Sequence, residues 1–270
     1  MSLRLRSELH FRVGARHCSA QAWSAGLGGQ PVAEATVDDW HADPLAEAWT
    51  RLRSSLDAGA VPHPRRAKIW IDDELLYMGQ LPATLSRAQA QAAAHQFFTQ
   101  ALLNESLHTA VSLSADGASW FTFALPMSQL AAWQGMLDES SIKVFSATPA
   151  ALLDLQRLGS HLQTQDELVV MAGAEGLRFA DHCGSGVRHL FWERCDTRDA
   201  QEVARCVTRQ LGDAIHTGQS SFGRDAPKPV LLIGLRAPQL ATLRHLVTAD
   251  QAATSWRIAP MPLLDSREAR

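Results

Sequence analysis

The sequence predicts an α/β protein of two lobes that share one order of elements: three strands, a helix, a strand, a helix and a strand. Three observations support this prediction. Short strand patterns joined by glycine turns open the chain and recur after its midpoint. Each group is followed by apolar residues at helical spacing and by further short strand patterns. The polar stretch 159–166, with few apolar residues and no periodicity, separates the two groups, so we expect lobes at 1–158 and 159–270.

The first lobe is expected to open with a three-stranded meander and a helix. Asp43-Pro44 suits a helix start, and Gly59 suits its end. Leu45, Trp49, Leu52 and Leu56 recur between them at helical spacing. The expected strands are 10–17, 19–25 and 31–37 before the helix, and 67–71 after it.

A small subdomain is expected as an insertion at about 72–127. Asp116-Gly117 between two strand patterns is a strong hairpin signal, and Pro149 suits the start of the helix that ends the lobe. The expected elements are an apolar stretch at 75–81, a helix at 87–103, strands at 108–114 and 118–125, a helix at 129–137, a strand at 142–146 and a helix at 150–158.

The second lobe is expected to repeat the opening plan. Its long helix begins near Asp199, with Thr197 or Asp196 as the capping residue. The expected elements are strands at 168–172, 177–182 and 187–193, a helix from 199 to about 217, a strand at 230–233, a helix at 238–247, a strand at 256–258 and a loose tail from 260.

Composition argues against several classes of protein. The 25 Lys and Arg residues against 28 Asp and Glu give a net charge of −3 and no basic field, so nucleic acid is not expected as a partner. The first 11 residues carry three charges, which argues against a signal peptide. No apolar run approaches the ~18–20 residues of a membrane helix. We therefore expect a cytoplasmic protein that does not insert into a membrane, with its four cysteines reduced.

Four segments, taken in order and at their spacing, carry a resemblance to a known family. They are 13–20 (VGARHCSA), 68–71 (KIWI) with the later 80–82 (QLP), 142–152 (IKVFSATPAAL) and 231–234 (LLIG). With the internal duplication, they resemble the actin, Hsp70 and sugar-kinase ATPase fold, which is ribonuclease H-like. Within it, the chain resembles PilM-like proteins of bacterial type IV pilus assembly and the cytoplasmic domains of GspL-like secretion proteins.

The resemblance implies a nucleotide site whose motifs are degenerate. The family has an Asp where this chain has Arg12, and no Asp lies in 169–176, where a second is usual. A Gly-rich loop that packs against adenosine is reduced to Gly234. The positions that correspond to nucleotide-binding loops are Gly14, Ala15, Arg16, Gly173 and Gly234. We expect a pseudo-ATPase without ATP or Mg²⁺ as cofactors. Arg12 is interpreted as a surface arginine, or as a residue that pairs with phosphate.

Two other groups contain residue types that can bind metal ions, but neither forms a usual metal-binding motif. His182, Cys183, His189 and Cys195 have no usual zinc spacing, and packing is the favoured interpretation. The acidic run 72–74 has ligand types for a divalent ion, but an exposed, solvated turn is favoured. No catalytic and no metal-binding residue is assigned.

The function that the resemblance implies is a non-catalytic scaffold of a pilus or secretion machine. In PilM-like proteins a short cytoplasmic peptide of an inner-membrane, PilN-like partner lies between the first lobe and its insertion, here about 69–125. Neighbouring strand residues point to opposite faces, so one of Trp120 and Phe121 is expected at the surface as a partner anchor. The alternative is a divergent ATPase or small-molecule kinase of the same fold.

Overall fold

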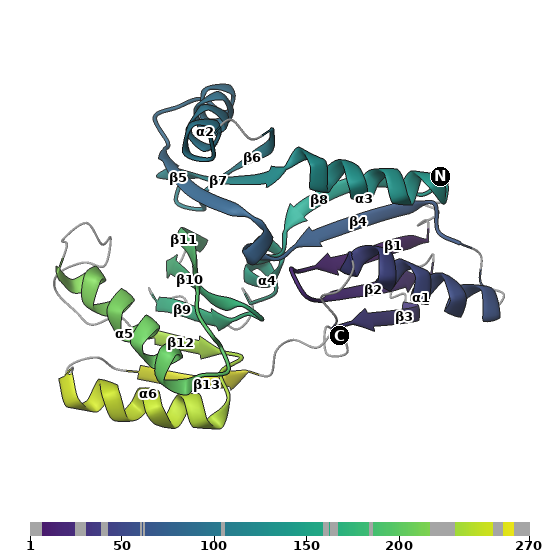
Figure 1. Cartoon of the computed structure of the whole chain (residues 1–270). Helices are drawn as coiled ribbons and strands as arrows, with labels where there is room; N and C mark the ends of the chain where they lie inside the picture. The colour runs from purple at the N-terminus through teal and green to yellow at the C-terminus, as the bar shows by residue number, and fades with distance from the viewer. Residues whose placement is uncertain are drawn as a thin grey trace, which may run out of the picture. The chain divides into compact units, whose positions relative to one another are not determined.

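A computed structural model of the chain describes residues 7–24, 31–38, 43–59, 61, 63–103, 106–158, 162, 167–183, 186–216, 230–250 and 256–261 (Figure 1). The chain divides into two compact units. The first comprises 1–78, 87–111 and 122–157, and the second comprises 79–86, 112–121 and 158–270. The limits expected from the sequence, 1–158 and 159–270 for the lobes and about 72–127 for the insertion, remain predictions.

A five-stranded sheet forms the centre of the first unit, in the order β3-β2-β1-β4-β8. The strands β1, β2 and β3 are antiparallel neighbours, whereas β4 runs parallel to β1 and β8 runs parallel to β4. Because Val13 pairs with Ile71 and Ile71 with Pro149, the three parallel strands end at the same edge. The strands are Glu8–Val13, Cys18–Trp23, Pro31–Val37, Arg66–Ile71 and Lys143–Pro149, in chain order.

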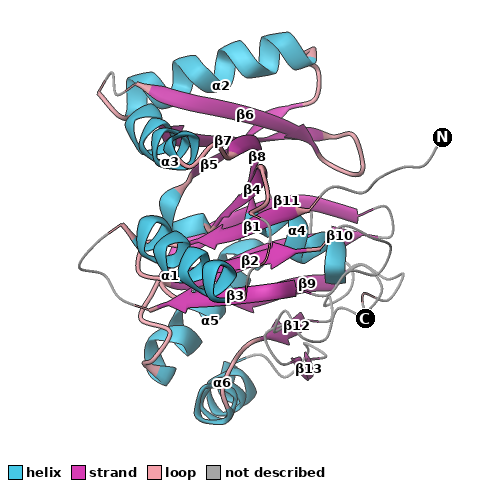
Figure 2. Cartoon of the chain, turned by 90° about the vertical axis from the view of Figure 1, so that its right-hand side faces the viewer, coloured by secondary structure: helices cyan, strands magenta, loops and turns pink. Residues whose placement is uncertain are grey.

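The residues of β1 alternate between a buried apolar side and a partly buried polar side. Leu9, Phe11 and Val13 are buried, and Glu8, His10 and Arg12 alternate with them. Helix α1 (Pro44–Ala58) packs against β2 and β3 (Figure 2). It begins as predicted, with the Asp43 carboxylate accepting a hydrogen bond from Leu45 N and with Pro44 in the first turn. Helix α3 (Met127–Glu139) adds its side chains to the same core.

The second five-stranded sheet has the order β11-β10-β9-β12-β13 and repeats the strand directions of the first. The predicted duplication is therefore confirmed. Its core joins apolar residues of the sheet to Val203 and Val207 of α5. The elements are β9 (Glu167–Ala172), β10 (Gly176–Cys183), β11 (Gly186–Arg194), α5 (Ala200–His216), β12 (Val230–Ile233), α6 (Ala237–Asp250) and β13 (Trp256–Met261).

A three-stranded sheet in the order β5-β7-β6 is formed by the segment between β4 and α3. The strands are β5 (Tyr77–Pro82), β6 (Leu107–Leu113) and β7 (Ser119–Pro126), with helix α2 (Arg87–Ala101) between β5 and β6. Gln91 of α2 donates to Thr109 O of β6 at 2.7 Å. Gly117 has a φ of 68° in the β6–β7 turn, which confirms the hairpin signal.

Three predicted boundaries were wrong for local reasons. Strand β1 ends at Val13 and not at residue 17, because Gly14 N donates to His17 O and closes a turn. The cap of α5 is Asp199, whose carboxylate accepts from Gln201 N at 2.8 Å; Asp196 instead accepts from Arg198 N. Strand β13 extends to Met261 through residues that were expected in the tail.

Candidate binding site at the carboxyl edge of the first sheet

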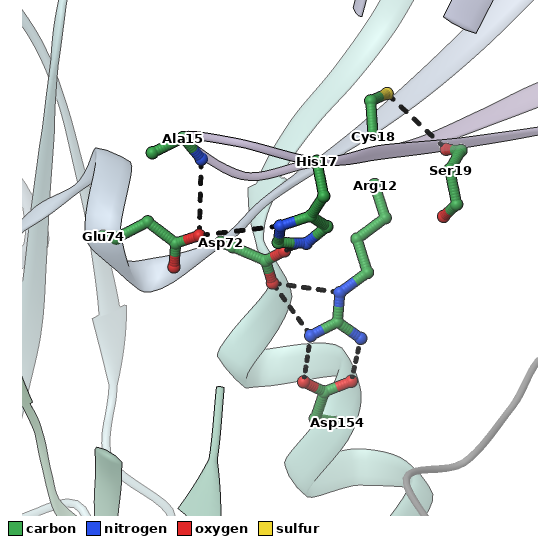
Figure 3. Close-up of polar contacts among 8 residues, drawn as sticks. All are labelled: Arg12, Ala15, His17, Cys18, Ser19, Asp72, Glu74 and Asp154. Atoms are coloured by element: carbon green, nitrogen blue, oxygen red, sulfur yellow. Dashed lines mark hydrogen bonds and ion pairs between the residues drawn. The ribbon is translucent and has the colours of Figure 1, made fainter. Parts of the chain in front are cut away.

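Three segments that follow parallel strands supply the candidate site (Figure 3). The β1–β2 turn follows β1, a short 3-10 helix (Asp73–Leu75) follows β4, and helix α4 (Ala150–Leu158) follows β8. Asp72 N donates to Val13 O at 2.8 Å, which holds the second segment against the first. Ligands of open α/β sheets commonly bind at this carboxyl edge.

Arg12 projects into this edge and is held by two carboxylates. Its Nε donates to Asp72 Oδ1 at 2.9 Å, and its Nη1 and Nη2 donate to the two oxygens of Asp154 at 2.9 and 2.8 Å. The Nη2 atom also lies 2.8 Å from Asp72 Oδ1. The side chain is 33% exposed and those of its partners 7% and 17%. Arg12 is therefore an ion-paired, half-buried residue and not the solvated surface arginine that the sequence suggested.

His17 lies on the other side of Asp72. Its Nε2 is 2.8 Å from Asp72 Oδ2, and since a carboxylate only accepts, Nε2 carries the proton. Its Nδ1 is buried without a hydrogen-bond partner and lies 4.0 Å from Glu74 Oε1. The same Glu74 oxygen accepts from Ala15 N at 3.3 Å. Asp72 thus holds one side of the ring, while Glu74 faces the other.

These contacts shift the pKa values of the cluster in different directions. The hydrogen bond to Asp72 raises the pKa of His17 against the effect of partial burial. Burial opposes ionisation of Asp72, but the hydrogen bond from His17 and the charge of Arg12 lower its pKa overall. Burial raises the pKa of Glu74, and the charge of Asp72 adds to this. The negative charge is therefore favoured on Asp72 and opposed on Glu74.

Gly14 is required by the packing of this turn. A Cβ atom at this position would lie 2.2 Å from His17 Cε1 and 2.5 Å from Glu74 Oε1. The side chains of His17 and Glu74 occupy the space in which any other residue would place its first carbon. Gly14 therefore permits the cluster to form.

The acidic run 72–74 was predicted to be an exposed turn, and this prediction was wrong. The Asp72 and Asp73 residues are only 5% and 2% exposed, and the side chain of Glu74 is 4% exposed. The contacts of Asp72 with Arg12 and His17 account for its burial, since a buried charge needs partners. Asp154 was not singled out from the sequence. The polar alternation of β1 placed Arg12 on this face, but no sequence signal linked it to α4.

The residues predicted at nucleotide-binding loops divide between the two units. Gly14, Ala15 and Arg16 form the β1–β2 turn, where the Ala15 amide already donates to Glu74. Gly173 N donates to Gly176 O at 2.9 Å in the β9–β10 turn. Gly234 follows β12 with a φ of 74°. Strands β9 and β12 are parallel neighbours, so Gly173 and Gly234 share the carboxyl edge of the second sheet. Their nucleotide role stays a prediction.

The turn after β12 is closed by its own side chains. Leu235 is 7% exposed and packs in the second core, and Gln239 is 4% exposed. The Gln239 side chain accepts from Arg236 N and donates to Thr197 O. The turn thus places side chains where a Gly-rich loop leaves its backbone open.

The two predicted partner anchors differ in accessibility. Trp120 is half-buried, and its Nε1 donates to Leu85 O at 2.9 Å. Phe121 is 4% exposed. The two alternate along β7 as expected, but burial removes Phe121 from the surface, so only Trp120 stays a candidate anchor.

His182, Cys183, His189 and Cys195, for which packing was favoured over zinc, form no metal-like group among the side chains that the structure describes. Among the described residues, the only group of His, Cys, Asp and Glu with metal-like proximity is His17, Asp72 and Glu74. His189 Nδ1 is instead 2.8 Å from Gln80 Oε1, and Cys195 is buried in the second core. The side chain of Cys183 lies outside the described part of the chain.

Comparison with known proteins establishes the fold. No family model matches the sequence, and no curated protein matches it. A Bacteroides thetaiotaomicron protein of unknown function with an actin-like ATPase fold is 12% identical, with a TM-score of 0.61 over 95% of this chain and 91% of the other. The chain therefore has the actin-like fold that the sequence predicted.

Two further solved structures come from assembly machines. A chain of the PilM-PilN type IV pilus biogenesis complex is 14% identical, with a TM-score of 0.62 over 93% of this chain and 88% of the other. The cytoplasmic domain of EpsL, an inner-membrane component of the type II secretion system of Vibrio cholerae, is 11% identical, with a TM-score of 0.52 over 95% and 90%. At these identities the likeness concerns the fold.

Proposed function

We propose that this protein is a non-catalytic scaffold of a type IV pilus or secretion machine that binds a cytoplasmic segment of an inner-membrane partner. The observation that carries the proposal is the ion-paired state of Arg12, whose guanidinium is directed at Asp72 and Asp154. The fold shared with the PilM-PilN complex and with EpsL supports the choice of machine.

The charge of the cluster opposes a nucleotide. Asp72, Glu74 and Asp154 supply three carboxylates against the single guanidinium of Arg12. Asp72 and Asp154 already engage that guanidinium, and Glu74 adds a third acidic group beside the turn. Phosphate groups are repelled by such a field. A scaffold needs no phosphate site, so this arrangement suits binding of a peptide and not turnover of ATP.

A divergent ATPase or small-molecule kinase is the second candidate. The three carboxylates favour this second candidate in one respect, because Mg²⁺ prefers oxygen ligands. Against it stand the Ala15 amide, which already donates to Glu74, and the filled turn at Leu235. A nucleotide titration separates the two candidates.

We place the partner peptide along the region of about 69–125, with Trp120 as an anchor. An extended peptide gains affinity from main-chain pairing and from a few side-chain pockets, and Trp is frequent among the residues that dominate binding energy.

Within the described residues, no helix has the length and apolarity to cross a membrane. We therefore propose that the protein is cytoplasmic and reaches the inner membrane through this partner, without nucleic acid.

Capture of partners from solubilised membranes tests the proposal. The tagged wild-type chain is expected to retain an inner-membrane assembly protein whose isolated cytoplasmic segment then binds directly. Trp120→Ala is expected to weaken that binding about 10- to 30-fold, as loss of a hot-spot residue does. Trp120→Phe keeps an aromatic ring and should lose less.

Phe145→Ala is the matched control, because Phe145 is also a partly exposed aromatic on a strand, but lies outside the proposed region. It should bind like the wild type. Equal affinity of the Trp120→Ala and wild-type chains would remove Trp120 from the site. Capture of no inner-membrane assembly protein would contradict the scaffold function itself.

A further inference from the structure

The unpaired nitrogen of His17 is the least satisfied polar atom of the cluster. Its Nδ1 is buried and has no hydrogen-bond partner, yet a carboxylate oxygen of Glu74 faces it at 4.0 Å. This distance is too long for a hydrogen bond. If Nδ1 carries no proton, two electron-rich atoms face each other without a hydrogen bond between them. A cation between them would remove that repulsion.

The distance suits a metal ion. Bonds from Zn²⁺ to histidine nitrogen and carboxylate oxygen are each about 2.0–2.2 Å, so two ligand atoms 4.0 Å apart can share one ion with a wide angle between the bonds. One ligand atom from each of His17, Asp72 and Glu74 lies within 4.8 Å of the others. A small adjustment of Glu74 brings the angle closer to tetrahedral.

The opposite side of the ring has the arrangement that metal-binding histidines usually show. A ligating histidine commonly donates its other N–H group to a carboxylate, which fixes the ring and its tautomer. His17 Nε2 donates to Asp72 Oδ2 at 2.8 Å, and Arg12 holds the other oxygen of Asp72. The free nitrogen is therefore the one that faces Glu74, and its direction is set by Arg12 and Asp72.

The charge and burial of the site agree with a divalent cation. The cluster sets the three carboxyl groups of Asp72, Glu74 and Asp154 against the single guanidinium of Arg12, and a divalent ion would offset this excess of acidic groups. The side chains of Asp72 and Glu74 are 7% and 4% exposed. The guanidinium of Arg12 is directed at its two carboxylates, so its charge is compensated within the cluster. A nitrogen ligand favours a transition metal over Mg²⁺ or Ca²⁺.

We propose that His17 Nδ1 and the Glu74 carboxylate bind one divalent transition-metal ion of the Zn²⁺ type, with water in the remaining positions and Asp72 orienting His17 from the outer shell. The ion links the β1–β2 turn to the segment after β4. The proposal goes beyond the scaffold function and does not depend on it. It also replaces the expectation that the chain holds no metal.

The test is titration of chelator-treated protein with Zn²⁺ alone, followed by calorimetry. The wild type is expected to bind one equivalent and to melt at a higher temperature with Zn²⁺ than with a chelator. Mg²⁺ is expected to bind more weakly than Zn²⁺. Glu74→Gln and His17→Ala remove one ligand each and are expected to lower the affinity more than about tenfold, since even loss of outer-shell groups costs 10- to 100-fold.

His63→Ala is the matched control, because His63 is a 36% exposed histidine of the same unit that pairs with Asp57. It should bind Zn²⁺ like the wild type. Loss of binding in His63→Ala with normal binding in His17→Ala would place the ion at the surface and overturn the proposal. Absence of saturable Zn²⁺ binding to the wild type would also overturn the proposal.

A wild-type measurement keeps the test decisive if the variants do not fold. A crystal of the full chain grown with Zn²⁺ is expected to show an anomalous peak about 2.0–2.2 Å from His17 Nδ1 and from a Glu74 oxygen. No peak at that position, with ordered side chains around it, would overturn the proposal.

Discussion

Arg12 determines the charge balance at the carboxyl edge of the first sheet. It makes a two-point contact with Asp154 and a further contact with Asp72, and the Asp72 contact in turn fixes His17. Bidentate guanidinium–carboxylate pairs combine geometric specificity with strength. The bonds that stabilise this edge also engage the guanidinium of Arg12, which could otherwise pair with a phosphate, and this agrees with the proposed absence of a nucleotide.

Replacement of Arg12 by Met tests the structural part of this argument. The change leaves the largely buried carboxylate of Asp72 without its cation, and breaking a buried pair in this way costs about 3–5 kcal/mol. Because Arg12 is 33% exposed, we expect a smaller loss of about 1–3 kcal/mol in the free energy of unfolding, measured with urea.

Arg51→Met is the control for that measurement. Arg51 pairs with Glu47 at 2.8 Å, but both side chains are exposed, by 52% and 42%. Exposed pairs contribute less than about 1 kcal/mol. Equal losses in the two variants would mean that the Arg12 cluster does not stabilise the fold.

At the scale of elements, most of the order of strands and helices could be predicted because the signals are local. The Asp43-Pro44 helix start, the helical spacing of apolar residues in α1 and the Asp116-Gly117 turn each depend on residues a few positions apart. The cluster could not be predicted in this way. Arg12 meets Asp72 and Asp154 across 60 and 142 residues, and only the register of the parallel strands brings them together.

The β1–β2 turn and helix α3 offer a comparison of glycines in two kinds of element. At Gly14 an added Cβ would overlap His17 and Glu74, whereas at exposed Gly135 of α3 no atom lies within 4 Å. Gly14→Ala is therefore expected to destabilise the chain by about 1–3 kcal/mol, as overpacking does. Gly135→Ala should stabilise it by about 0.4–1 kcal/mol.

Both variants are measured by urea unfolding of the full chain. A loss on Gly14→Ala that disappears in the background of His17→Ala would assign the overlap to the imidazole ring. A Gly14→Ala chain as stable as the wild type would show that the ring moves without cost, and would contradict the tight packing of the turn.

At the scale of the whole molecule, the two five-stranded sheets have corresponding strand orders. The residues at their carboxyl edges differ in chemical character. The first sheet ends in the charged cluster around Arg12, and the second ends in a turn filled by Leu235 and Gln239. The strand order is maintained by apolar cores that are built mainly from residues within the strands and helices. The fold therefore persists when the residues at its edges change, and does not by itself define an activity.

The measurement that tests the central claim most directly is thermal unfolding of the full chain in millimolar Mg·ATP, with Mg²⁺ alone as the reference. A ligand at 100 times its Kd stabilises a protein by about 2.7 kcal/mol, which raises Tm by several degrees in a chain of this size. We predict the same Tm in both solutions. A saturable increase in Tm with Mg·ATP that Mg²⁺ alone does not produce would contradict the account and favour the divergent ATPase.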